Sequence, residues 1–107
     1  MSTKYDFLIS SNYKIYAIYN EKGLVTVYGY ISGLATGTTI NLGATKFKCY
    51  YSTNFAPYAL LSFYNHAEPY EPIGSVWINK AGTVNIYKPS DVTQGYISGT
   101  YFSNISS

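Results

Sequence analysis

The strongest fold signal in the chain is the stretch IGSVWINKAGTVNIY, which runs from residue 73 to residue 87. Two runs rich in β-branched and aromatic residues flank a turn at residues 79–82, which predicts a β-hairpin. If Asn79 pairs with Thr83, alternate side chains of the two strands share a face. The apolar set would form core, and it consists of Val76, Ile78, Val84 and Ile86. The opposite face would carry Trp77, Asn85 and Tyr87.

A second hairpin is predicted from residues 13–19 and 24–31, which flank the turn sequence Asn20-Glu21-Lys22-Gly23. One face of this hairpin would again be core, with Ile15, Ala17, Val25 and Val27. The other face is also apolar or aromatic, with Tyr16, Ile18, Tyr28 and Tyr30. An antiparallel sheet with one solvated face should not show this pattern. We therefore expect a symmetric partner subunit to cover these four side chains as an oligomer interface.

The rest of the chain reads as further short strands, and no segment shows a sustained helical period. Strands are predicted at residues 38–42, 46–51, 56–65 and 95–105, with a loop at 66–72. Seven or eight strands in about 100 residues favour an all-β fold, an antiparallel β-sandwich of jelly-roll type more than a closed barrel. The head domain would span residues 13–107, after an N-terminal segment or linker at 1–12.

Composition narrows the classes of partner. The chain has 107 residues, of which 47% are hydrophobic and 11% charged, so one folded domain is expected. Seven lysines and five carboxylates give a net charge of +2 without a basic stripe, which argues against nucleic acid. No apolar run approaches the roughly 18 residues of a membrane span, and the N-terminus does not resemble a signal peptide. We expect a protein made in the cytoplasm that does not insert into membranes.

The residues that carry catalysis or bind metals are sparse. The carboxylates are Asp6, Glu21, Glu68, Glu71 and Asp91, and four of the five fall in predicted turns or termini. His66 is the single histidine and Cys49 the single cysteine, too few for the usual zinc ligand sets or for an internal disulfide. We therefore expect no enzyme, no metal and no cofactor.

Fourteen tyrosines point instead to binding, because surface tyrosine offers rigid contact area at low entropic cost. Saccharides lie against aromatic rings while amides and carboxylates bond their hydroxyls. The predicted ligand-binding residues are Trp77, Asn85 and Tyr87 on the second hairpin, with Tyr70, Glu68 and His66 from the 66–72 loop. The alternative is that Trp77 packs into a subunit interface.

Three stretches give the chain a family resemblance: GLVTVYGYI at residues 23–31, TTINL at 38–42, and the hairpin at 73–87. In their order they resemble the C-terminal head domain of phage tail-tip and baseplate receptor-binding proteins, and the closing GTYF at 99–102 is similar in kind. One departure concerns the segment LGATKFK at 42–48, which lacks the two prolines that family members often carry there.

The resemblance implies a jelly-roll β-sandwich that forms a homotrimer, binds saccharide on the host cell surface and sits in the virion tail beside other tail or baseplate proteins. It transfers no binding residue to this chain. Two other functions remain open from the residues: a structural baseplate or cap domain without a ligand, and a cellular carbohydrate-binding module.

Overall fold

The computed structural model describes residues 2–20, 22–50 and 58–104, which form strands and loops without a helix. The strands are β1 (Ser2–Ile9), β2 (Tyr13–Asn20), β3 (Leu24–Ile31), β4 (Thr39–Ala44), β5 (Lys48–Cys49), β6 (Ala59–Tyr64), β7 (Pro72–Ile78), β8 (Thr83–Tyr87) and β9 (Gly95–Asn104). The all-β class predicted from the sequence is therefore confirmed.

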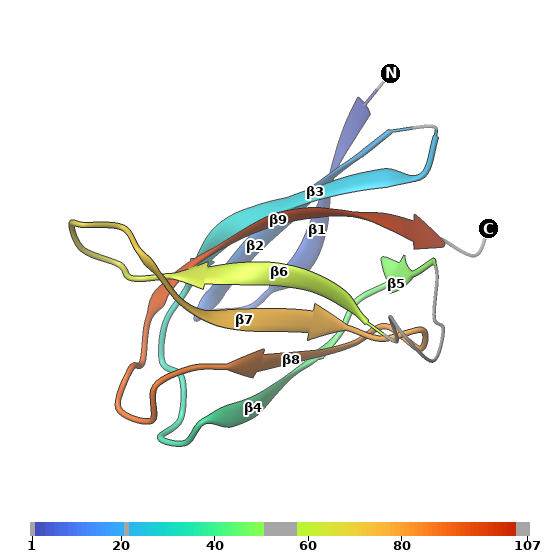
Figure 1. Ribbon diagram of the computed structural model, residues 1–107. Coiled ribbons are helices and arrows are strands. Elements are labelled where there is room, and N and C mark those ends of the chain that lie inside the picture. Colours follow the sequence, from blue (N-terminus) through green and yellow to red (C-terminus); the bar gives the residue numbers. More distant parts are fainter. Residues whose placement is uncertain (1, 21, 51–57, 105–107) are drawn as a thin grey trace.

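The strands form a curled antiparallel sheet, a half-barrel, in the order β1-β2-β3-β9-β6-β7-β8-β4, with β5 added on β9 (Figure 1). β9 holds the sheet together, because it pairs with β3 on one side and with β6 on the other. The curl brings the two edge strands toward each other. Leu8 of β1 lies 4.0 Å from the position that a Cβ on Gly43 of β4 would occupy.

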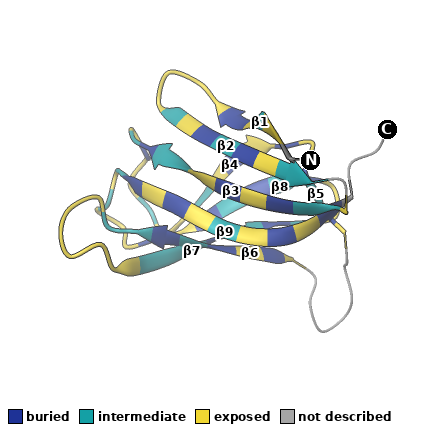
Figure 2. Cartoon of the chain, turned by 90° about the horizontal axis from the view of Figure 1, so that it is seen from above, coloured by how far each residue is buried: buried dark blue, intermediate teal, exposed yellow. Residues whose placement is uncertain are grey.

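Both predicted hairpins form with the predicted registers. In β7 and β8, Val76 pairs with Ile86 and Ile78 with Val84. In β2 and β3, Ala17 pairs with Val27. All eight predicted core side chains of the two hairpins are at most 1% exposed, namely Ile15, Ala17, Val25, Val27, Val76, Ile78, Val84 and Ile86. The alternation of buried and exposed residues along these strands follows the two-residue period of a β-strand (Figure 2).

The N-terminal stretch is part of the sheet. Residues 1–12 were expected to precede the domain, but Ser2–Ile9 forms β1 and pairs with β2 from Ser2↔Asn20 to Ile9↔Lys14. A register shift between Asp6 and Leu8 turns both Phe7 and Leu8 into the core. This bulge interrupts the simple alternation that identifies a strand in sequence, and the domain therefore begins before residue 13.

The remaining strands agree with the prediction in position and differ in length. β4 extends the predicted 38–42 strand to Ala44, and only Lys48–Cys49 of the predicted 46–51 strand is paired. Residues 51, 56, 57 and 105, at the ends of three predicted strands, lie outside the described residues.

The core lies on the concave side of the curled sheet. Phe47, in the connection from β4 to β5, is completely buried there. Its ring lies 5.7 Å from that of Tyr5, 6.1 Å from Phe7 and 5.9 Å from Tyr19, measured between centroids. One aromatic residue of an irregular segment thus fills the space under β1 and β2.

Candidate functional site: a tyrosine-lined hollow

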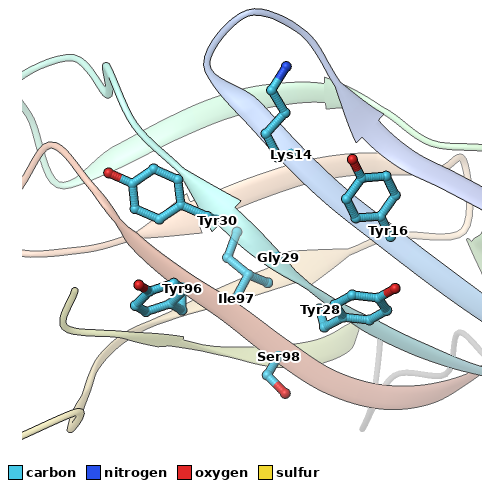
Figure 3. A pocket seen from close by; sticks show the side chains of 8 residues that line it. All are labelled: Lys14, Tyr16, Tyr28, Gly29, Tyr30, Tyr96, Ile97 and Ser98. Carbon is cyan, nitrogen blue, oxygen red and sulfur yellow. The ribbon is translucent and has the colours of Figure 1, made fainter. Parts of the chain in front are cut away.

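The outer face of the sheet carries a hollow of about 460 Å³ where β2, β3 and β9 run side by side (Figure 3). We call it the tyrosine hollow, and it is lined by Lys14, Tyr16, Tyr28, Gly29, Tyr30, Tyr96, Ile97 and Ser98. Four aromatic rings from three strands therefore surround one open space.

Strand register brings these side chains together. Tyr30 of β3 pairs with Lys14 of β2 and with Tyr96 of β9. One step along, Tyr28 pairs with Tyr16 and with Ser98. The residues between them in sequence face the core, because successive side chains of a strand point to opposite faces. The side chains of the hollow therefore lie on the opposite face of the sheet from the buried residues that alternate with them.

The rings pack on one another and stay partly open. Tyr16 lies 5.9 Å from Tyr28, and Tyr30 lies 5.4 Å from Tyr96, between centroids. Tyr70, from the loop after β6, meets Tyr96 edge-on at 6.0 Å. Tyr28, Tyr96 and Tyr70 are 37%, 41% and 56% exposed. Aromatic pairs at these separations hold each other in place, so the hollow offers ordered ring surface to a ligand.

Three of the four residues predicted to form a subunit interface line the hollow: Tyr16, Tyr28 and Tyr30. The fourth, Ile18, is 38% exposed on the same face. Part of the aromatic surface that suggested a partner subunit is therefore covered by neighbouring rings of the same chain, and by the Lys4 ammonium, which lies 4.2 Å from the Tyr16 ring centroid.

The predicted ligand residues of the second hairpin lie on the same outer face, farther along the sheet. Trp77 pairs directly with Asn85, and Tyr87 pairs with Ser75. Tyr87 is 53% exposed, whereas Trp77 is only partly exposed and meets the Tyr58 ring at 6.3 Å. Trp77, Asn85 and Tyr87 therefore lie on one face of the sheet, as predicted.

The structure separates the three predicted loop residues. Tyr70 joins the rim of the tyrosine hollow through Tyr96. His66 lies near Gln94, in a different pocket. Glu68 is exposed in the loop, before a cis peptide bond to Pro69.

Sequence reasoning missed Tyr96, Ser98, Lys14 and Gln94. The first two come from β9, and nothing in the local sequence shows that β9 lies beside β3. The alternation in YISGTYF from residue 96 does place Tyr96 and Ser98 on one face of a strand. With the pairing of β3 and β9 known, this pattern would identify them as site residues.

The metal-ligating side chains of the described residues do not form a metal site. Within residues 2–20, 22–50 and 58–104, no three His, Cys, Asp or Glu side chains come close enough to hold an ion. The same residues include no helix long and apolar enough to cross a membrane. The chain matches no protein-family model, no curated protein and no solved structure.

Proposed function

We propose that this chain binds saccharide in the tyrosine hollow. The observation that carries the proposal is the hollow itself, in which four tyrosines from β2, β3 and β9 surround about 460 Å³ of open space. The apolar face of a sugar ring packs against aromatic rings, while its hydroxyls need hydrogen-bonding groups nearby. The exposed lining of the hollow is almost entirely apolar, which suits the face of a sugar ring, and Ser98 of β9 is the residue of the lining whose hydroxyl could pair with a sugar hydroxyl.

We further propose, from the sequence resemblance, that the chain is a receptor-binding head of a phage tail and acts without catalysis or a cofactor. A jelly-roll sandwich and a three-fold assembly with other tail proteins belong to this proposal. Its support is the aromatic outer surface of the hollow together with the exposed apolar side chain of Ile18 on the same face. In this arrangement the subunit contact is limited to the surface around Ile18, because Tyr16, Tyr28 and Tyr30 line the hollow that receives the host saccharide.

The test is binding of cell-wall polysaccharides extracted from a panel of bacteria, measured by calorimetry. The Tyr96→Ala variant should weaken binding at least about tenfold, because an aromatic anchor at a binding site typically contributes that much. Phe102→Ala is the matched control: Phe102 is also an exposed aromatic residue of β9, and it lies outside the residues that line the hollow. It should bind as the wild type does.

Two outcomes contradict the proposal in different ways. If Trp77→Ala abolishes binding while Tyr96→Ala leaves it unchanged, the site is the predicted Trp77 platform instead of the hollow. If the wild-type chain binds no polysaccharide of the panel, saccharide recognition is rejected.

A structural role as a baseplate or cap domain is the second candidate, favoured by one observation. Leu60 and Phe102, on the paired strands β6 and β9, are 66% and 59% exposed, and neighbouring exposed apolar side chains are typical of protein contacts. They would then contact a neighbouring tail protein. Loss of assembly in a Leu60→Ser variant, with no saccharide binding in the wild type, would support this role.

A further inference from the structure

A second pocket lies beyond the ends of β6 and β8, between the loops that follow these strands. Its volume is about 190 Å³. We call it the polar pocket, and it is lined by Asn65, His66, Asp91, Val92, Thr93 and Gln94. All but the valine carry groups that donate or accept hydrogen bonds. This set of two amides, an imidazole, a carboxylate and a hydroxyl suits a ligand rich in hydroxyl groups.

One wall of the polar pocket, the loop from β8 to β9, is fastened to the loop from β3 to β4. The amide of Leu34 donates to the carbonyl of Thr93 at 3.0 Å, and the amide of Gly37 donates to that of Ser90 at 3.0 Å. The buried ammonium of Lys88 donates to the carbonyls of Gly37 at 2.8 Å and Ser90 at 3.3 Å. The wall is therefore held in place before a ligand arrives, which lowers the entropic cost of binding.

Tyr30 joins the polar pocket to the tyrosine hollow. Its ring lines the hollow, while its hydroxyl points away from Tyr16 and Tyr28 (Figure 3) and donates to the Oε1 atom of Gln94. The Nε2 atom of Gln94 lies 3.3 Å from that of His66. A short chain of hydrogen-bonding side chains thus runs from one pocket to the other.

We propose that the two pockets are adjacent subsites for one saccharide chain. The tyrosine hollow holds the ring of one sugar unit, and the polar pocket binds the hydroxyls of the next unit. This inference rests on the proposed function and adds that the ligand is an oligosaccharide of at least two units.

Charge narrows the class of the second unit. Asp91 is an exposed carboxylate of the polar pocket, and Glu68 and Glu71 are exposed in the loop that also supplies Asn65. The ammonium of Lys88, the cation of the neighbouring loop, is buried against backbone carbonyls. Like charges repel, so the unit in the polar pocket carries hydroxyl or amino groups and no carboxylate or phosphate.

The test compares fragments of two lengths, one unit and four units, prepared from the polysaccharide that the wild-type chain binds. The Asp91→Ala variant should weaken binding of the four-unit fragment about tenfold, as expected for a lost hydrogen bond to a charged group. Its affinity for the one-unit fragment should not change. In NMR titrations of the wild type, the amides of Thr93 and Gln94 should shift with the longer fragment only.

The matched control is Asp6→Ala, which removes an exposed carboxylate from β1 and should bind both fragments normally. Thr93→Val, which keeps the side-chain shape, repeats the test in case Asp91→Ala does not fold. If both variants bind the four-unit fragment as tightly as the wild type, the second subsite is rejected. The hollow then stands, since the one-unit fragment still binds there.

A separate experiment tests the prediction that the second sugar unit carries no carboxylate or phosphate. The immobilised chain should retain neutral or amino-bearing oligosaccharides from a hydrolysate of the same polysaccharide, as judged by anion-exchange chromatography of the retained fraction. Retention of acidic oligosaccharides, without neutral or amino-bearing ones, would contradict the prediction that the second unit carries no carboxylate or phosphate.

Discussion

Tyr101 is the buried residue that ties the irregular β4–β5 connection to the sheet. Its side chain is 8% exposed, and its hydroxyl donates to the backbone carbonyl of Phe47 at 2.6 Å. Phe47 packs under β1 and β2, so this bond connects β9 with the aromatic centre of the core. A buried carbonyl that loses such a donor has no water to replace it.

The Tyr101→Phe substitution should therefore lower the free energy of unfolding by about 1–3 kcal/mol, since it leaves the Phe47 carbonyl without its donor. Urea unfolding at neutral pH measures this difference. Tyr87→Phe serves as control, because Tyr87 is 53% exposed and should change stability by no more than about 0.5 kcal/mol. Equal effects of the two substitutions would show that the buried bond contributes nothing.

Burial also raises the pKa of Tyr101 above its ordinary value of 10.0, and Cys49 adds to this shift. The folded chain then keeps the Tyr101 proton at pH values where the unfolded chain releases it. The contribution to stability is complete below about pH 10 and is lost as the pH rises further. The free energy of unfolding should fall more steeply above about pH 10 in the wild type than in Tyr101→Phe. Parallel pH profiles from urea unfolding would contradict the shift.

At the scale of strands, the β2–β3 hairpin depends on a close approach at Gly29. A Cβ atom on Gly29 would lie 2.2 Å from the carbonyl oxygen of Lys14 and 2.6 Å from the Cα of Ile15. No real side chain tolerates these distances from backbone atoms, so the two strands can come this close only because residue 29 is glycine. The same residue leaves the floor of the tyrosine hollow open.

The Gly29→Ala substitution should push β2 and β3 apart and destabilise the fold by about 1–3 kcal/mol or more, as overpacked sites do. Urea unfolding gives the stability, and the polysaccharide assay should show weaker binding in the variant that remains folded. Thr26→Ala, on the exposed face of the same strand, should cost no more than about 1 kcal/mol. A fully stable Gly29→Ala variant would mean that the strands separate without cost.

At the scale of the whole molecule, large apolar side chains are exposed on the outer face of several strands. Outside the tyrosine hollow, Ile18, Leu60 and Phe102 are 38%, 66% and 59% exposed. Homo-oligomers bury surfaces of this kind in symmetric contacts. The sequence resemblance implies a trimer, and we predict this state for the chain.

The expected solution mass is therefore near three times 11.9 kDa, measured by light scattering at micromolar concentration. An Ile18→Ser variant should shift the mass toward that of one chain, because it places a hydroxyl in the predicted contact. A wild-type chain that scatters as a monomer would remove the trimer and favour a carbohydrate-binding module that acts alone.

The local sequence pattern was enough to predict much of the fold. Alternating apolar residues and the turns at Gly23 and Gly82 gave both hairpins, their registers and their buried faces, because strand period and turn geometry act over a few residues. The same reasoning missed β1, whose bulge between Asp6 and Leu8 breaks the alternation. Phe47 was also missed as a core residue, since it lies outside any regular strand.

The order of the strands and both pockets depend on contacts between distant parts of the chain. β9 pairs with β3 of the first hairpin and with β6, which in turn pairs with β7 of the second hairpin. This pairing brings Tyr96 to Tyr30 and Gln94 to His66. Antiparallel strands with similar alternation can pair in many orders, so sequence pattern alone does not select among them. Composition predicted that tyrosine side chains lie on the surface, and the pairing of β2, β3 and β9 decides where four of them gather.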